Sequence, residues 1–155
     1  MAEPMAIDLA QVDLRGPDPS TFPCAAPEAN RVTAWGERHV LWLGPDEWLV
    51  VGQAGTEGTI VEELEETLRG RFASIVDVSA NRIAFDLTDA LDLLATGCPI
   101  DLDPTRWVPG MCAQTLFGLA QVLLHQRGPR TTRAFVRPSF AGYFLGRIGA
   151  VETFS

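Results

Sequence analysis

The chain of 155 residues contains no lysine, so all twelve of its basic residues are arginines. Without a lysine amine, it cannot form a Schiff base, build a P-loop phosphate clamp or use lysine as a general base. Twenty acidic residues give a net charge of -8, and no dense arginine cluster alternates with aromatic residues. Because such a chain repels polyanions, nucleic acid is not an expected partner.

Cysteine and histidine are scarce, and long apolar runs are missing. Cys24, Cys98 and Cys112 are odd in number and far apart, which favours a reducing cytoplasm over a disulfide scaffold. His39 and His125 lie in strand-like runs without metal-ligand spacing, so we expect no metal site. The apolar runs fall far short of the ~20 residues that span a bilayer, and no basic segment precedes one. We therefore expect neither a membrane span nor a secretory signal.

The residues that are present suit a folded domain with an uneven charge. The length is that of one domain, and a hydrophobic content of 46% can build a core. Residues 1–66 hold 13 acids and 3 arginines, whereas residues 67–155 hold 7 acids and 9 arginines. This asymmetry fits either an interaction face or one acidic, solvated helix.

Residues 1–30 contain five prolines and little hydrophobic periodicity. We expect a proline-rich acidic arm here, lying against another surface instead of forming a core element, and a single α+β domain over residues 31–155. The arm is a candidate strap for a basic partner surface.

β-branched and aromatic runs predict the first strands, and a capping motif predicts the first helix. The predicted strands are residues 32–35, 39–43 and 48–51. The last two form a hairpin whose turn contains Pro45. Thr59 and Glu62 have the spacing of a capping box and predict a helix over residues 59–68.

The second half combines strands and helices in a similar way. The predicted strands are residues 75–79, 83–87, 111–117, 119–125 and 132–136. Thr88 is expected to cap a short helix, and Pro138 to start a final one. The residues expected to be buried by that final helix are Phe140, Phe144 and Ile148. The order predicts an α+β fold with a largely antiparallel sheet covered by helices, with two ferredoxin-like halves as one arrangement.

The polar clusters all have a structural interpretation. Residues 52–58 are glycine-rich and precede a helix, but they lack the spacing of a phosphate-binding motif, and nearby glutamates would repel an anion. Asp77 and Ser79 predict a polar corner in which Arg82 can pair with Asp77. Asp101 and Asp103 alternate with apolar residues as in a turn or edge strand, with no distinct acid and base.

A hydrolase would require Ser79 or Ser139 beside one of the two histidines, and neither serine lies in a nucleophile elbow. We therefore name no catalytic, cofactor-binding or metal-binding residue. Four tryptophans are a large number for this chain: Trp35, Trp42, Trp48 and Trp107. Core packing explains Trp42 or Trp48, on opposite sides of one hairpin, and an exposed tryptophan would anchor an interface.

Five segments of the sequence, in this order, resemble the γ subunit family of heterotetrameric sarcosine oxidase. They are LWLGPDEWLV (41–50), VDVSANR (76–82), LLATGCPIDL (93–102), PGMCAQT (109–115) and VRPSFA (136–141). Together they cover about residues 31–150. The resemblance implies a fold similar to the folate-binding domain of the glycine-cleavage T-protein. A Lys-Gly-Cys signature of related iron-sulfur maintenance proteins is absent.

The resemblance further implies an accessory subunit. The assembled enzyme demethylates sarcosine oxidatively to glycine and passes the one-carbon unit to tetrahydrofolate. FAD, FMN and NAD belong to its larger subunits, so no cofactor is expected on this chain, and the expected partners are the α, β and δ subunits. Two alternatives stay open: a stand-alone folate-dependent one-carbon transfer protein, and the serine hydrolase described above.

Overall fold

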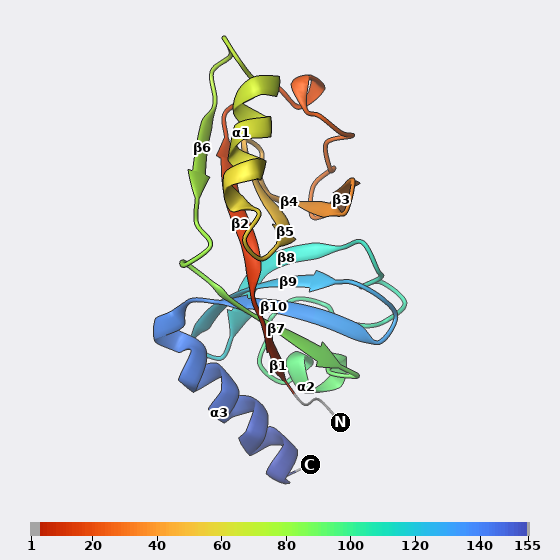
Figure 1. Ribbon diagram of the computed structural model, residues 1–155. Coiled ribbons are helices and arrows are strands. Elements are labelled where there is room, and N and C mark those ends of the chain that lie inside the picture. Colours follow the sequence, from red (N-terminus) through yellow and green to blue (C-terminus); the bar gives the residue numbers. More distant parts are fainter. Residues whose placement is uncertain (1–3, 155) are drawn as a thin grey trace. The chain divides into compact units, whose positions relative to one another are not determined.

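The computed structural model describes the backbone of residues 4–154 and the side chains of residues 4–149. The chain forms two compact units, Asp8–Ala80 and the described parts of Met1–Ile7 with Asn81–Ser155. Each unit contains one five-stranded sheet in which every pairing is antiparallel (Figure 1). The predicted α+β class with antiparallel sheets is confirmed. The unit boundaries fall after residues 7 and 80, and not after residue 30.

The unit Asp8–Ala80 contains five strands, a short 3-10 turn and one helix. These elements are β2 (Leu9–Arg15), η1 (Pro19–Thr21), β3 (Val32–Trp35), β4 (Arg38–Gly44), β5 (Glu47–Gln53), α1 (Glu57–Thr67) and β6 (Ser74–Asp77). Its strand order is β3-β4-β5-β2-β6. The order of elements differs from the β-α-β-β-α-β of a ferredoxin-like half.

Part of the expected arm is in the sheets: residues 5–7 form a strand of the second unit and Leu9–Arg15 form β2, so the expectation of an arm outside the core is wrong for these residues. β2 lies between β5 and β6, and its Ala10, Val12 and Leu14 are buried. These three residues alternate with Gln11 and Asp13, which is the period of a strand with one face on a core. All five prolines of residues 1–30 lie outside β2, in the segments on either side of it.

The predicted hairpin is confirmed as β4 and β5, joined by a turn that contains Pro45. Trp42 pairs with Trp48 across the hairpin, so both side chains lie on the same face of the sheet, and the expectation that they lie on opposite sides is wrong. Trp48 is buried, and the ring of Phe22 packs edge-on against it with 4.6 Å between centroids. Part of the proline-rich segment therefore covers the buried core cluster of this unit, to which Trp48 belongs.

Helix α1 packs its apolar side on the sheet of the same unit, beside β2, β5 and β6 (Figure 1). Ile60 and Leu64 are fully buried, while the glutamates between them face outward. The helix begins at Glu57 after Thr56, whose carbonyl accepts the hydrogen bond of the Ile60 amide. The predicted capping box at Thr59 is therefore wrong: Thr59 is already inside the first turn.

The second unit contains five strands and two helices. They are β1 (Met5–Ile7), β7 (Ile83–Thr88), α2 (Leu91–Ala95), β8 (Cys112–Phe117), β9 (Ala120–Gln126), β10 (Thr131–Val136) and α3 (Pro138–Phe154). The strand order is β1-β7-β10-β9-β8. The predicted strands of this half are confirmed to within a residue or two at most ends.

The core of the second unit lies between its sheet and its two helices. Phe144 of α3 contacts Phe85 and Phe117 of the sheet at ring-centroid distances of 5.7 and 5.5 Å. Ile148 is buried as predicted, but Phe140 is 37% exposed. Phe140 lies one turn before Phe144, where the helix has only begun to cover the sheet.

The expected cap of the short helix is also wrong. Thr88 is the last residue of β7, and α2 begins at Leu91 after Ala90, which makes no side-chain capping bond. Asp89 between them has a φ of 53°, and its amide donates to the carbonyl of Arg130. The tight connection therefore leaves no room for a capping Thr88.

Candidate functional site

The polar corner predicted around Asp77 and Ser79 is present and is structural. Asp77 Oδ1 accepts hydrogen bonds from the Ser79 hydroxyl at 2.7 Å and the Ser79 amide at 3.0 Å. The amide of Gln11 donates to the Ser79 Oγ at 2.9 Å, which connects β2 to the segment after β6. The two bonds from Ser79 hold the pKa of Asp77 below its usual value.

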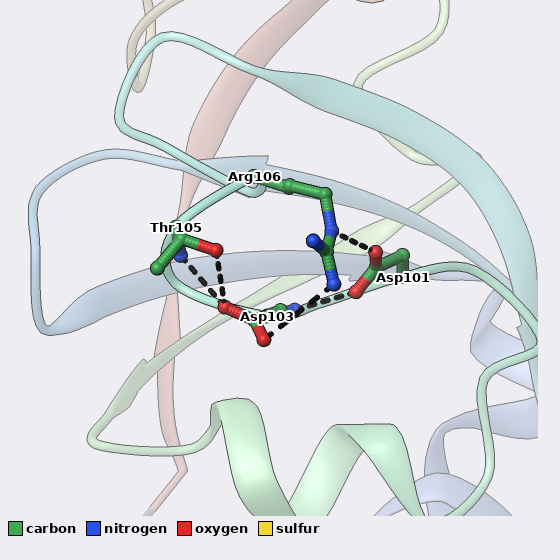
Figure 2. Close-up of polar contacts among 4 residues, drawn as sticks. All are labelled: Asp101, Asp103, Thr105 and Arg106. Atoms are coloured by element: carbon green, nitrogen blue, oxygen red, sulfur yellow. Dashed lines mark hydrogen bonds and ion pairs between the residues drawn. The ribbon is translucent and has the colours of Figure 1, made fainter.

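Asp101 and Asp103 belong to a loop and do not form an acid-base pair (Figure 2). Asp101 accepts from the amide of Asp103 at 3.0 Å, and Asp103 from the amide and hydroxyl of Thr105 at 2.9 and 2.7 Å. Arg106 forms ion pairs with both carboxylates. Both carboxyl pKa values are lowered, mainly by these backbone hydrogen bonds. Because neither group is biased toward the protonated form, neither is suited to donate a proton near neutral pH.

Neither candidate nucleophile is bonded to a histidine. The hydrogen bonds of Ser79 involve Asp77 and Gln11. Ser139 is exposed on the first turn of α3, and its hydroxyl makes no hydrogen bond with the described residues. His125 is buried on β9, and His39 is partly buried on β4. The arrangement that a serine hydrolase needs is thus not assembled at either serine.

The remaining candidate residues are mostly buried. Cys98 and Cys112 are buried, Cys24 is partly buried, and none of the three is in a disulfide bond. Trp48 and Trp107 are buried, and the Trp107 indole donates to the side chain of Gln126 at 2.9 Å. Trp35 and Trp42 are partly buried against the core cluster that contains Trp48. None of the four tryptophans is therefore an exposed residue that could anchor an interface.

The described residues contain neither a metal-binding cluster nor a helix that could span a membrane. No group of three or more histidine, cysteine, aspartate or glutamate side chains is placed to hold a metal ion. No described helix combines the length and apolar composition needed to cross a membrane.

One open groove in the second unit brings together residues from four strand ends. Its volume is about 400 Å³, and its lining includes Arg82, Gln114, Leu116, Gln121, Phe135 and Arg137. β7 and β9 begin at this end of the sheet, and β8 and β10 finish there, as the pairing of Val136 with both Ile83 and Val122 requires. The groove therefore combines two guanidinium groups with side-chain amides and an apolar floor.

Sequence reasoning did not find this groove. Arg82 was expected beside Asp77, and Arg137 received no role. The two arginines are 55 positions apart in the chain, and only the antiparallel order of β7 and β10 brings them to the same end of the sheet. Only a prediction of which strands pair could have brought Arg82 and Arg137 together, because the pattern of side chains along the sequence does not show that they are neighbours.

The glycine cleavage system aminomethyltransferase T from Bartonella henselae matches 92% of this chain and 44% of its own length, with a TM-score of 0.70 and 14% identity. At that identity the likeness shows the fold alone. The chain is thus an α+β protein with the two-sheet fold found in T-proteins.

Comparisons of sequence identify the family, which is a more specific assignment than the fold. Residues 21–150 match the model of the sarcosine oxidase, gamma subunit family, and the chain belongs to that family. The sarcosine oxidase gamma subunit of Corynebacterium sp. strain P-1 is 34% identical over 103 residues, which are 65% of this chain and 50% of that protein. That of strain U-96 is 32% identical over 119 residues, 75% of this chain and 57% of that protein. The chain thus matches about half the length of these relatives.

A solved complex gives a closer structural match. A chain of the heterotetrameric sarcosine oxidase from Corynebacterium sp. U-96, determined with pyrrole 2-carboxylate, superposes with a TM-score of 0.87 and 26% identity. The match covers 99% of this chain and 85% of that one. The expected resemblance to the gamma subunit family and to the T-protein fold is therefore confirmed.

Proposed function

We propose that this chain is the accessory gamma subunit of a heterotetrameric sarcosine oxidase and that it supports assembly of the complex. The observation that carries the proposal is the match to a chain of such a heterotetramer over 99% of this chain. The partners are the α, β and δ subunits, and the complex demethylates sarcosine to glycine with transfer of the one-carbon unit to tetrahydrofolate.

The chemistry of the complex belongs to the partners in this proposal. FAD, FMN, NAD and tetrahydrofolate are bound by the larger subunits, and this chain contributes surface. The environments of Ser79, Asp101 and Asp103 support this division, because their hydrogen bonds fix loops and strand connections. The lack of a disulfide bond among the three cysteines supports a location in the reducing cytoplasm.

Co-expression with the three partner subunits tests the proposal. Size-exclusion chromatography of the mixture is expected to show this chain eluting with the larger subunits. A chain that always elutes alone, while the other subunits assemble, would contradict the proposal.

The alternative, a stand-alone folate-dependent transfer protein, rests on the T-protein fold alone. Calorimetry separates the two, because the accessory role predicts no heat of binding when tetrahydrofolate is added to the isolated chain. Saturable binding by the isolated chain would favour the alternative.

A further inference from the structure

We infer that the groove at the end of the second sheet, with the apolar residues beside it, is a docking surface for an acidic segment of a larger subunit. This inference rests on the proposed function and names the surface that carries it out. We call the region the end surface, and its defining residues are Arg82, Leu116, Leu119, Arg137 and Phe140.

The apolar part of the end surface shares Leu116 with the groove. Leu116 lines the groove and is 43% exposed, and Leu119, in the turn that follows β8, is 76% exposed. The Leu119 amide donates to the Tyr143 hydroxyl at 3.0 Å, and the Tyr143 ring lies edge-on to Phe140 at 6.4 Å. The turn and the first helical turn of α3 are therefore tied together, and both present large apolar side chains to solvent.

The shape of the groove favours a macromolecule over a small ligand. Gln114, Gln121 and Arg137 are exposed although they line it, so a small molecule would stay largely in water. Small-molecule sites usually bury roughly 70–90% of the ligand surface, which this open groove could not do. A protein segment can cover the open side and exclude water from the contacts.

The charge of the groove selects an acidic partner. Its lining contains two arginines and no aspartate or glutamate. The exposed Arg137 side chain makes no ion pair with any described residue, a condition that it shares with the exposed Arg71 of the other unit. A guanidinium group binds a carboxylate with two parallel hydrogen bonds, and arginine and aromatic residues, here Arg137 and Phe140, are enriched at protein interfaces.

The occupant of the end surface is a segment of a larger subunit that brings carboxylates to Arg82 and Arg137 and an apolar side chain to Leu119 and Phe140. Against a chain of net charge -8, such a segment is attracted only where arginines gather, so charge fixes the place of docking.

Charge reversal in the assembled complex tests the surface. The variants are Arg137→Glu alone and Arg82→Glu with Arg137→Glu, and the matched control is Arg69→Glu, which reverses an exposed arginine of the other unit. Arg137→Glu is included because Arg82 makes contacts of its own. Circular dichroism and thermal unfolding select variants that retain the fold.

Binding to immobilised partner subunits is measured at low and high salt. We expect the double variant to bind about 100-fold more weakly, Arg137→Glu about 10-fold more weakly, and Arg69→Glu within about twofold of wild type. Raising the salt from about 0.05 to 0.5 M is expected to weaken wild type more than the double variant.

The outcomes are distinguishable from failure of the proposed function. If wild type does not bind the partner subunits at all, the proposed function fails. If wild type binds and folded double variant binds equally well, only the end surface is overturned. Self-association of wild type that the same variants abolish would also overturn it, since the occupant would then be a second copy.

Discussion

At the scale of single residues, the polar groups singled out in the sequence serve to join segments. Asp77 accepts two hydrogen bonds from Ser79, and the Ser79 hydroxyl oxygen accepts a hydrogen bond from the amide of Gln11 in β2. The residue types of the corner were predictable because short polar side chains favour turns. The bond to Gln11 was not, because it joins positions 68 residues apart.

Ser79→Ala is expected to raise the pKa of Asp77 toward its ordinary value, because the hydroxyl bond is the largest cause of the lowered pKa. A lowered carboxyl pKa stabilises the fold above the unfolded pKa of about 4, and this contribution is lost as pH falls through the folded pKa. The stability difference from wild type should therefore shrink below about pH 4. NMR titration of the carboxyl carbon measures the shift, with Ser74→Ala as the control. An unchanged Asp77 pKa in Ser79→Ala would contradict the assignment.

The buried thiols make a second prediction at this scale. Burial raises the pKa of Cys98 to about 11, and Cys112 is 0% exposed. Because a thiolate is the reactive form, both should resist maleimide at pH 8 in the folded protein and react in urea. Cys24 is only partly buried and should react first. Mass spectrometry of the labelled peptides reads the order, and rapid native labelling of Cys98 would contradict it.

At the scale of elements, the sequence predicted every described strand except β1 and β2, mostly to within two residues, but it placed two helix starts wrongly. The β4–β5 hairpin was predictable because its turn carries Pro45 between two apolar runs. β2 was missed although its buried residues Ala10, Val12 and Leu14 alternate with polar ones. The prolines on either side of it led to the prediction of an arm over all of residues 1–30. Both predicted helix caps failed because a threonine near a helix start is only one of several ways to begin it.

Leu14→Ala tests the inner position of β2. Leu14 is 1% exposed, so truncation is expected to lower the free energy of unfolding by about 2–5 kcal/mol. The same substitution at Leu119, which is exposed, should change it by less than about 0.5 kcal/mol. Urea unfolding followed by tryptophan fluorescence measures both. Equal stability of the two variants would mean that β2 is not part of the core.

Gly118→Ala tests the turn between β8 and β9. Gly118 has a φ of 61°, and an added Cβ would lie 2.6 Å from the Arg147 guanidinium and against the Tyr143 hydroxyl. The backbone conformation alone is expected to cost about 1–2 kcal/mol. Gly128→Ala is the control, because nothing lies within 4 Å of its added Cβ. Urea midpoints that match for the two variants would contradict the account of this turn.

At the scale of the whole molecule, the charge asymmetry of the sequence has two sources. Helix α1 explains much of the acidic half, since its glutamates face outward. Asp13 lies in β2 and pairs with Arg15 of the same strand, so it is not part of an arm, while Asp18 and Glu28 are exposed outside the strands. Docking of these acids on a basic partner surface stays a prediction. The arginines of the other half include the two that line the groove. The family was predictable from five sequence segments, but the groove needed the fold.

The central claim is that this chain is a subunit of a larger assembly, and native mass spectrometry tests it most directly. The chain is co-expressed with affinity-tagged α, β and δ subunits, and the purified material is weighed intact. The account predicts one main species whose mass includes a single copy of the 16.9 kDa chain. It also predicts that this chain is lost from the complex in the double variant Arg82→Glu with Arg137→Glu. A tagged complex of the larger subunits that never contains this chain would contradict the account.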